Sequence, residues 1–418
     1  MICSEIELLE RIKNVIVDVE VLENEFTLKR VRKFLDVANK LIPQKVKVFV
    51  PENYSEEQIG LIRRLGLPRN SIVNRPRNLY KRYQLIHKVF GKTNPNWVEC
   101  RQTLYLNYFE SNNPIHIPNE SNVYSSVNFP PTNKEVIPII CPLRKLYTCN
   151  IVRNCINNCI YCYIPSTGTP ILPLVVCVNM PEKIREQIKR MKKPYIIANF
   201  GSITDPCNPL IDNVFRVFRE SFSILKEYNY PTLILTKSNP SREILEELKY
   251  ENALLAFSFY HLNPDIKRKW ELNTPPPYEV LRSIKEAKTL GVRLAFRIDV
   301  FPGYNDDLDL LERIVKLAAY YGIEHITGGS LRARPAILQR IKTLNPSMYK
   351  LIFTSLDKRN YSDHSMRPAK KLRTIWYSRL SQVCKEIKIP FALCKEEVEL
   401  LEKFSHSPCL CQWVTREQ

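Results

Sequence analysis

Strand and helix signals alternate along the middle of the chain, and this pattern restricts the fold more than any other feature of the sequence. Between residues 174 and 331, short apolar runs are each followed by a helix-like segment. The apolar runs are LVVCVN, YIIANF, TLILTKS, LLAFSFY, RLAFRIDVF and HITGGSL. Strands joined by helices at this spacing pair in parallel. The sequence therefore predicts a parallel sheet, open or closed into a barrel, with function at the carboxyl ends of the strands.

One of these strands, residues 293–301, carries charges on one of its two faces. Side chains alternate between the faces of a strand, so the apolar residues face one side while Arg297 and Asp299 face the other. In a barrel, the charged side faces the lumen. Charges there either pair with each other or bind a polar ligand, and the sequence leaves both interpretations open.

The rest of the chain divides into an N-terminal unit and a C-terminal extension. Residues 14–20 and 45–50 are short apolar strands, each followed by a helix-like segment, as in a small α/β unit. Residues 66–140 are rich in Pro, Asn and Tyr, which predicts an irregular connection. We therefore predict three parts: an N-terminal α/β domain with its connector at 1–135, the βα units at 136–345, and a basic, cysteine-containing extension at 346–418.

Composition and cysteine usage indicate a reducing compartment. The chain has 418 residues, 44% of them hydrophobic, and lacks both an apolar run of about 20 residues and an apolar signal segment at its start. We expect a cytoplasmic protein that does not enter a membrane. Thiols stay reduced there and often bind metals, so the thirteen cysteines indicate metal sites rather than disulfides.

The charge of the chain suits a polyanionic partner. Basic residues exceed acidic residues by 62 to 43, a net charge of +19. Part of this excess lies in residues 332–373, which we call the basic segment. Aromatic residues within this segment or just beyond it, Trp376 and Tyr377 among them, could stack on bases. The alternative is a solvated basic surface. The nucleic-acid-binding candidates are Arg332, Arg334, Lys370, Lys371 and Arg373.

Three cysteines stand in a CxxxCxxC spacing: Cys155, Cys159 and Cys162. A structural zinc ion takes four ligands, and Cys149 is the fourth cysteine that a zinc site here would use. A 4Fe–4S cluster held by three thiolates instead leaves one iron with an open coordination position. Such an iron can bind a substrate or a cofactor directly, so the absence of a fourth cysteine in the motif favours a catalytic iron–sulfur site.

This motif, followed by Tyr163 at the start of a series of βα units, resembles the radical S-adenosylmethionine (SAM) enzymes. The resemblance implies that Cys155, Cys159 and Cys162 hold the cluster and that Tyr163 lies beside the adenine of SAM. In that family the open iron binds the amino and carboxylate groups of SAM, and an electron from the cluster cleaves it to a 5′-deoxyadenosyl radical. An electron donor such as ferredoxin or flavodoxin is then implied as a partner.

Six segments, in order along the chain, resemble the spore photoproduct lyase group of this superfamily and its relatives. The first two match the lyase group and the others its broader relatives: NVIVDVEVLENEFTLKRVRKF, LVVCVNMPEKIREQI, GSITDPCNPL, LTKSNPSREIL, WELNTPPPYEVLRSIKEAKTLGV and FRIDVFPGYND. The resemblance implies a partial (β/α)6 TIM-type barrel. It implies that Lys237 and Ser258 hold the carboxylate or ribose of SAM, and that Ser202 and Asp205 line the same rim. Loop capping is the alternative for these four, and Arg297 joins the cofactor-binding candidates as a lumen cation.

The sequence departs from the lyases where they keep a catalytic cysteine. Spore photoproduct lyases split a thymine dimer and use a cysteine after the second barrel strand to return a hydrogen atom to the product radical. That position falls on Ser202 or Ile203, and the nearest thiol is Cys207. Either Cys207 replaces the donor from a shifted loop, or the reaction needs no thiol donor. Tyr147 lies close to the position of the lyases' radical-relay tyrosine.

The C-terminal part contains four further cysteines that are candidates for a second metal site. They could hold an auxiliary iron–sulfur cluster or a structural zinc ion, or they could be unligated buried residues. The candidates are Cys384, Cys394, Cys409 and Cys411.

These features together predict a radical SAM enzyme that acts on nucleic acid, in lyase-like DNA repair or in base modification. Two alternatives stay open. A radical enzyme acting on a small molecule or a protein would use the same cluster, with the positive charge as background. A zinc-stabilised nucleic-acid-binding protein would have no catalytic activity and would leave Lys237, Arg297 and Asp299 unexplained.

Overall fold

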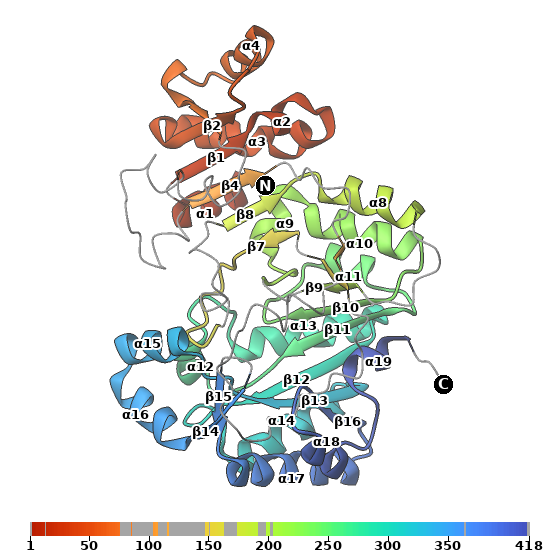
Figure 1. The fold of residues 1–418 in the computed structure, drawn as a ribbon. Helices are drawn as coiled ribbons and strands as arrows, with labels where there is room; N and C mark the ends of the chain where they lie inside the picture. The colour runs from red at the N-terminus through yellow and green to blue at the C-terminus, as the bar shows by residue number, and fades with distance from the viewer. Residues whose placement is uncertain are drawn as a thin grey trace.

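Two large sheets organise the chain, one N-terminal and one formed by the middle and C-terminal parts (Figure 1). The computed structural model describes residues 2–12, 14–75, 85, 103–107, 115–116, 147–149, 151–162, 174–190, 198–200, 204–362 and 365–415. In these ranges, no helix has the length and apolar character needed to span a bilayer.

The first sheet has the strand order β3-β2-β1-β4-β8-β7. The parallel strands are β1 (Asn14–Asp18), β2 (Val46–Val50), β3 (Ile72–Asn74), β4 (Thr103–Asn107) and β8 (Leu174–Cys177), and β7 (Val152–Arg153) runs antiparallel to β8. The helices of this part are α1 (Ile2–Arg11), α2 (Val19–Glu23), α3 (Glu25–Leu41) and α4 (Glu56–Arg64), with short 3-10 helices at Pro43–Lys45 and Arg69–Ser71.

Strand β8 is the LVVCVN run that the alternating pattern assigns to the same sheet as the later strands. It pairs with β4 of the first sheet instead, so that assignment is wrong. An apolar run of four residues predicts a strand but contains no information about which sheet the strand joins. The division of the chain at residues 135 and 345 stays a prediction.

The second sheet contains an open half barrel, with the order β16-β13-β12-β11-β10-β9-β6-β5. Six strands, β6, β9, β10, β11, β12 and β13, are consecutive parallel neighbours, which confirms the expected partial (β/α)6 arrangement, and β16 extends it at one edge. Strand β5 (Ile115–His116) pairs antiparallel with β6 at the other edge. The parallel strands are β6 (Tyr147–Cys149), β9 (Ala198–Phe200), β10 (Thr232–Thr236), β11 (Ala253–Ser258), β12 (Leu294–Val300), β13 (His325–Ser330) and β16 (Phe391–Leu393).

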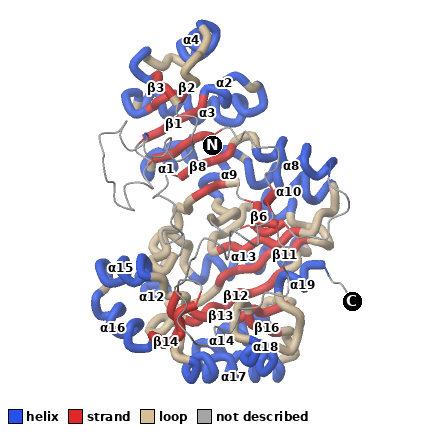
Figure 2. The backbone as a smooth tube through the Cα atoms, in the orientation of Figure 1, coloured by secondary structure: helices blue, strands red, loops and turns tan. Residues whose placement is uncertain are grey.

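Helices flank the strands of the second sheet (Figure 2). Local chemistry explains their ends: α13 begins at Pro277, whose ring fixes φ, and ends before Gly291, which has a φ of +81°. The helices are α8 (Met180–Arg190), α9 (Pro209–Phe215), α10 (Val217–Glu227), α11 (Arg242–Glu247), α12 (Pro264–Trp270), α13 (Pro277–Leu290), α14 (Leu308–Tyr320), α15 (Pro335–Leu344), α16 (Pro346–Ser355), α17 (Lys370–Glu386), α18 (Val398–Phe404) and α19 (Leu410–Thr415). A hairpin of β14 (Leu356–Ser362) and β15 (Ser365–Pro368) lies between α16 and α17.

The two faces of the half barrel have different cores. Phe296 and Ile298 belong to the main core, which includes buried residues of the outer helices. Arg293, at the amino end of β12, donates hydrogen bonds to the carbonyl oxygens of Trp413 (3.2 Å) and Val414 (3.1 Å). Helix α19 therefore packs across the amino end of the half-barrel lumen. A site would then lie at the carboxyl end of the strands. The small apolar cluster on this inner face contains Leu233, Leu254, Ala256, Ala295, Leu410 and Val414.

Candidate active site

The three motif cysteines lie on one loop that follows β7. Asn154 and Asn158 adopt positive φ values of 66° and 54°, a conformation that asparagine tolerates better than most residues, and these residues bend the loop. The thiols of Cys155 and Cys162 are partly exposed, whereas Cys159 is buried. The backbone N–H of Asn157 donates to Cys155 Sγ at 3.5 Å. The loop is therefore bent around its three cysteines, two of which are partly exposed.

Two distant segments hold this loop. The segment Trp270–Thr274 begins at the last residue of α12. It accepts a hydrogen bond from the N–H of Ile160 at Trp270 O (2.9 Å) and donates one from Asn273 Nδ2 to Ile156 O (2.8 Å). Cys159 and Glu271 also form an antiparallel bridge. From the other side, Arg340 of α15 donates to the carbonyl oxygen of Cys159 (3.0 Å) and to Asn158 Oδ1 (2.6 Å).

Asp205 forms a network of hydrogen bonds that joins the loop to the rim of the half barrel. Its carboxylate accepts hydrogen bonds from Asn157 Nδ2 (2.8 Å), Thr236 Oγ1 (2.7 Å) and the N–H groups of Lys237 (2.7 Å) and Cys207 (3.1 Å). Each carboxylate oxygen accepts two of these bonds. These are the contacts of a capping residue, and binding of a cofactor by Asp205 stays a prediction.

Lys237 follows β10 directly and has a buried ammonium group. Its Nζ lies 3.8 Å from the ring centroid of Tyr260 and 3.6 Å from Glu271 Oε1, and it has no hydrogen-bond partner among the described atoms. Burial lowers the pKa of Lys237, but Tyr260 and Glu271 outweigh burial, so the pKa is raised and the group stays charged. A buried cation with unused hydrogen-bond donors is suited to a carboxylate ligand.

Arg297 and Asp299 pair with each other on β12. Arg297 Nε lies 2.9 Å from Asp299 Oδ2, its second nitrogen lies 3.0 Å from Oδ1, and the Tyr260 hydroxyl donates to Oδ2 at 3.0 Å. Burial would raise the pKa of Asp299, but Arg297 outweighs it and the pKa is lowered. A Cβ at Gly329 would lie 2.3 Å from Asp299 Oδ1, so only glycine fits beside this pair. Ser258, at the end of β11, is the neighbour of Arg297 across the sheet and is half-buried.

The site fits a three-thiolate cluster with a bound cofactor. All three cysteines come from one held loop, and two polar atoms nearby, Lys237 Nζ and the hydroxyl of Tyr304, are buried without a partner among the described atoms. Among the described residues, no three His, Cys, Asp or Glu side chains converge as ligands of a single metal ion would. Cys149 is a core residue whose thiol pKa is raised by burial, which disfavours it as a fourth ligand.

The second metal site expected from the C-terminal cysteines stays a prediction. These four cysteines are described by the structure, and no three of them come together as ligands of one metal ion would. Cys384 is fully buried in the main core, and burial raises the pKa of its thiol to about 12. Cys409 differs, because a hydrogen bond from Cys411 lowers its pKa to about 6. Cys384 therefore behaves as the unligated core residue of the alternative interpretation.

The structure describes two of the remaining candidate residues, Cys207 and Tyr147, and leaves out the other two. Cys207 is fully buried in the main core, and burial raises the pKa of its thiol well above the usual value. Tyr147 lies in β6, on the strand that leads to the cysteine loop. Tyr163 and Ser202 lie outside the described residues. The roles of all four stay predictions.

The basic segment contains two kinds of residue that sequence alone does not separate. Arg373 is fully buried and pairs with Glu396 (2.5 Å) and Glu397 (2.9 Å), so its prediction as a nucleic-acid-binding residue is wrong. Trp376 and Tyr377 are also buried, which rules out base stacking on them. Lys371 and Lys370 are exposed, the latter paired with Glu399, and Arg332 and Arg334 are half-buried.

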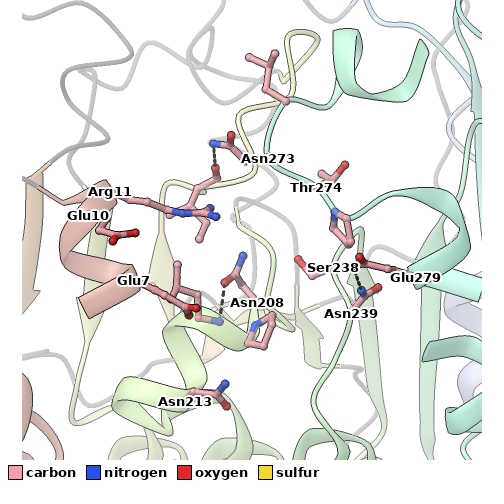
Figure 3. Close-up of a pocket in the computed structure, with 15 residues that line it drawn as sticks. Glu7, Glu10, Arg11, Asn208, Asn213, Ser238, Asn239, Asn273, Thr274 and Glu279 are labelled. Atoms are coloured by element: carbon pink, nitrogen blue, oxygen red, sulfur yellow. Dashed lines mark hydrogen bonds between the residues drawn. The ribbon is translucent and has the colours of Figure 1, made fainter. Parts of the chain in front are cut away.

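A polar cavity of about 660 Å³ lies beside the cysteine loop (Figure 3). Glu7 and Glu10 approach it from α1, and Asn239, which donates to Glu279 at 3.2 Å, lies across from them. Ile156, between the first two motif cysteines, forms part of the wall. The cavity therefore lies between α1 and the cysteine loop.

Comparison with known proteins defines the class of this site. Residues 149–314, which contain the three motif cysteines, match the family model of the Radical SAM superfamily. The middle part of the chain, with the cysteine loop, is thus a radical SAM domain.

Within that superfamily, the chain has the fold of the spore photoproduct lyase group. It is similar to spore photoproduct lyase complexed with dinucleoside spore photoproduct, with 12% identity, a TM-score of 0.61, and coverage of 91% of this chain and 98% of that chain. A variant of that lyase with bound AdoMet and the same dinucleoside gives 13% identity, a TM-score of 0.59 and the same coverage. A search of the curated proteins finds no match.

Proposed function

We propose that this protein is a radical SAM enzyme that modifies or repairs nucleic acid in the cytoplasm, with ferredoxin or flavodoxin as its electron donor. The observation that carries the proposal is the fold match along nearly the whole length of a lyase that binds a dinucleoside lesion. The net charge of +19 adds support, because a polyphosphate partner releases counterions when basic residues bind it.

In this proposal the residues of the chain bind the cluster and SAM and orient them toward the substrate. Cys155, Cys159 and Cys162 would hold the 4Fe–4S cluster, which with SAM supplies a 5′-deoxyadenosyl radical. Lys237 would bind the carboxylate of SAM, because its buried ammonium group has donors to spare. Arg297 would be oriented toward the cofactor or the substrate by its two bonds to Asp299. The surrounding apolar rings would exclude water, as radical chemistry requires.

The positions of the thiols favour a reaction different from thymine-dimer repair. Cys207 lies in the apolar core, and the position of the lyases' donor falls on Ser202 or Ile203. We therefore favour base modification or repair without a thiol donor at that place. Tyr147 and Cys207 are the residues to test for a relay or a donor role.

The test is product formation by the anaerobically reconstituted enzyme with dithionite and SAM. We expect 5′-deoxyadenosine formation to rise when single-stranded or lesion-containing oligonucleotides are added, and a change in nucleoside mass to follow. Equal formation with and without oligonucleotides, together with binding that is weak and insensitive to salt, would favour a small molecule or a protein as the substrate. Colourless protein containing zinc would favour the non-catalytic alternative.

A further inference from the structure

Glu271 is a buried carboxylate beside the cysteine loop to which neither the motif nor the cofactor assigns a role. It is fully buried, and its backbone bridges to Cys159. Its side chain accepts a hydrogen bond from the hydroxyl of Tyr161, which stands between the second and third motif cysteines. The carboxylate therefore contacts the loop through both its backbone and its side chain.

Two lysines keep this carboxylate charged. Lys267 Nζ, itself almost fully buried, lies 3.1 Å from Glu271 Oε2, and Lys237 Nζ lies 3.6 Å from Oε1. Lys267 is held in turn by Thr274 and by the carbonyl oxygen of Pro275 at 2.7 Å. A buried carboxylate with two ammonium neighbours is ionised, and in an environment of low dielectric constant its charge acts strongly at short range.

Tyr161 is fixed by packing as well as by this hydrogen bond. Its ring centroid lies 4.4 Å from that of Phe301, 6.1 Å from Tyr260 and 6.2 Å from Trp270. The hydroxyl of Tyr161 therefore has one position, directed at Glu271. The charge of Glu271 is thus held at a constant place relative to the thiols.

We propose that Glu271 is a positioning residue that fixes the cysteine loop through Tyr161 and lowers the reduction potential of the cluster held by that loop. A negative charge near a cluster disfavours the added electron, and local charge is one of the terms that set such potentials. A lower potential makes the reduced cluster a stronger reductant. The proposal rests on the assignment of the cluster and does not depend on the substrate.

Potentiometric titration of the reconstituted protein, followed by electron paramagnetic resonance, tests this proposal. Glu271→Gln removes the charge and keeps the shape, so we expect wild-type iron and sulfide content and a midpoint potential shifted to a more positive value. Glu271→Asp keeps the charge and should restore a potential close to that of the wild type. Glu324→Gln, which changes an ion-paired carboxylate at the amino end of the strands, is the matched control and should shift nothing.

An unchanged potential in a Glu271→Gln protein with full iron content would overturn the proposal while leaving the cluster assignment intact. If that variant does not fold or does not retain iron, Lys267→Met decides, because it removes a compensating positive charge. It should then shift the potential to a more negative value, and no shift or a positive shift would overturn the proposal. Absence of iron from the wild type would instead refute the cluster itself.

Discussion

Arg340 donates a hydrogen bond to the carbonyl oxygen of Cys159 at 3.0 Å and so joins two residues 181 positions apart. The same guanidinium group reaches Asn158 Oδ1. The residue belongs to the basic segment, yet its contacts are those of a support for the cysteine loop.

Replacement of Arg340 by alanine should loosen the loop. Hydrogen bonds from a charged donor contribute about 1.5–3 kcal/mol each, so we expect a loss of roughly that size in the free energy of unfolding. Reconstituted iron should also dissociate faster on dilution. Lys342→Ala, on the exposed side of the same helix, is the control. Equal iron retention by Arg340→Ala and wild type would show that the loop does not need this support.

Replacement of Cys155, Cys159 and Cys162 together by alanine should abolish 5′-deoxyadenosine formation. The fold should persist, because the loop is held by backbone and side-chain bonds to Asn273 and Arg340 rather than by its thiols. Circular dichroism and product analysis measure the two effects. Product formed by this variant at wild-type rates would contradict the cluster assignment.

Replacement of Cys384 by alanine should leave the iron content unchanged. The residue packs in the main core, so we expect about four iron atoms per chain in both proteins and a stability loss of about 1 kcal/mol. About eight iron atoms in the wild type, reduced to four in the variant, would support a second cluster that uses Cys384.

Lys371 and Arg373 should respond differently to substitution. Lys371→Glu should weaken oligonucleotide binding and reduce its salt dependence, because the side chain is exposed and able to contact a phosphate. Arg373→Met removes a buried cation that pairs with Glu397 and is one of two arginine partners of Glu396, which costs roughly 3–5 kcal/mol of stability. Denaturant unfolding and binding titrations separate these effects. Weaker binding by a fully stable Arg373→Met protein would contradict the structural role.

Stability should fall between pH 6.5 and pH 4 because of His325. Burial lowers the pKa of its imidazole to about 4, and Nε2 lies 2.9 Å from the carbonyl oxygen of Pro408. The unfolded chain binds a proton at this imidazole near pH 6.5, whereas the folded chain binds it only near pH 4. The contribution of the neutral imidazole to the free energy of unfolding is therefore full above pH 6.5 and is lost as the pH falls toward 4. The loss is roughly 3 kcal/mol. His325→Gln should flatten this part of the stability profile, and parallel profiles for the two proteins would contradict the assignment.

The sequence predicts the half barrel and the cysteine loop well, because both depend on local patterns. Periodicity identifies strands β9 to β13, and spacing identifies three thiolates on one loop. Glu271 and Arg340 contact the cysteine loop from positions more than 100 residues away along the chain. No local sequence pattern predicts such contacts. Charge alone also misplaces Arg373, since its partners Glu396 and Glu397 become neighbours only through the fold.

The position of helix α19 bears on the direction from which ligands and partners would reach the site. Because Leu410 and Val414 pack against the sheet at the amino end of the lumen, the proposed cofactor, substrate and electron donor would all approach from the carboxyl end, where the cysteine loop lies. A long polyanion bound across that end would cover the face that a protein reductant needs. We therefore expect reduction and substrate binding to alternate in time, so that excess nucleic acid slows turnover with a protein donor but not with dithionite.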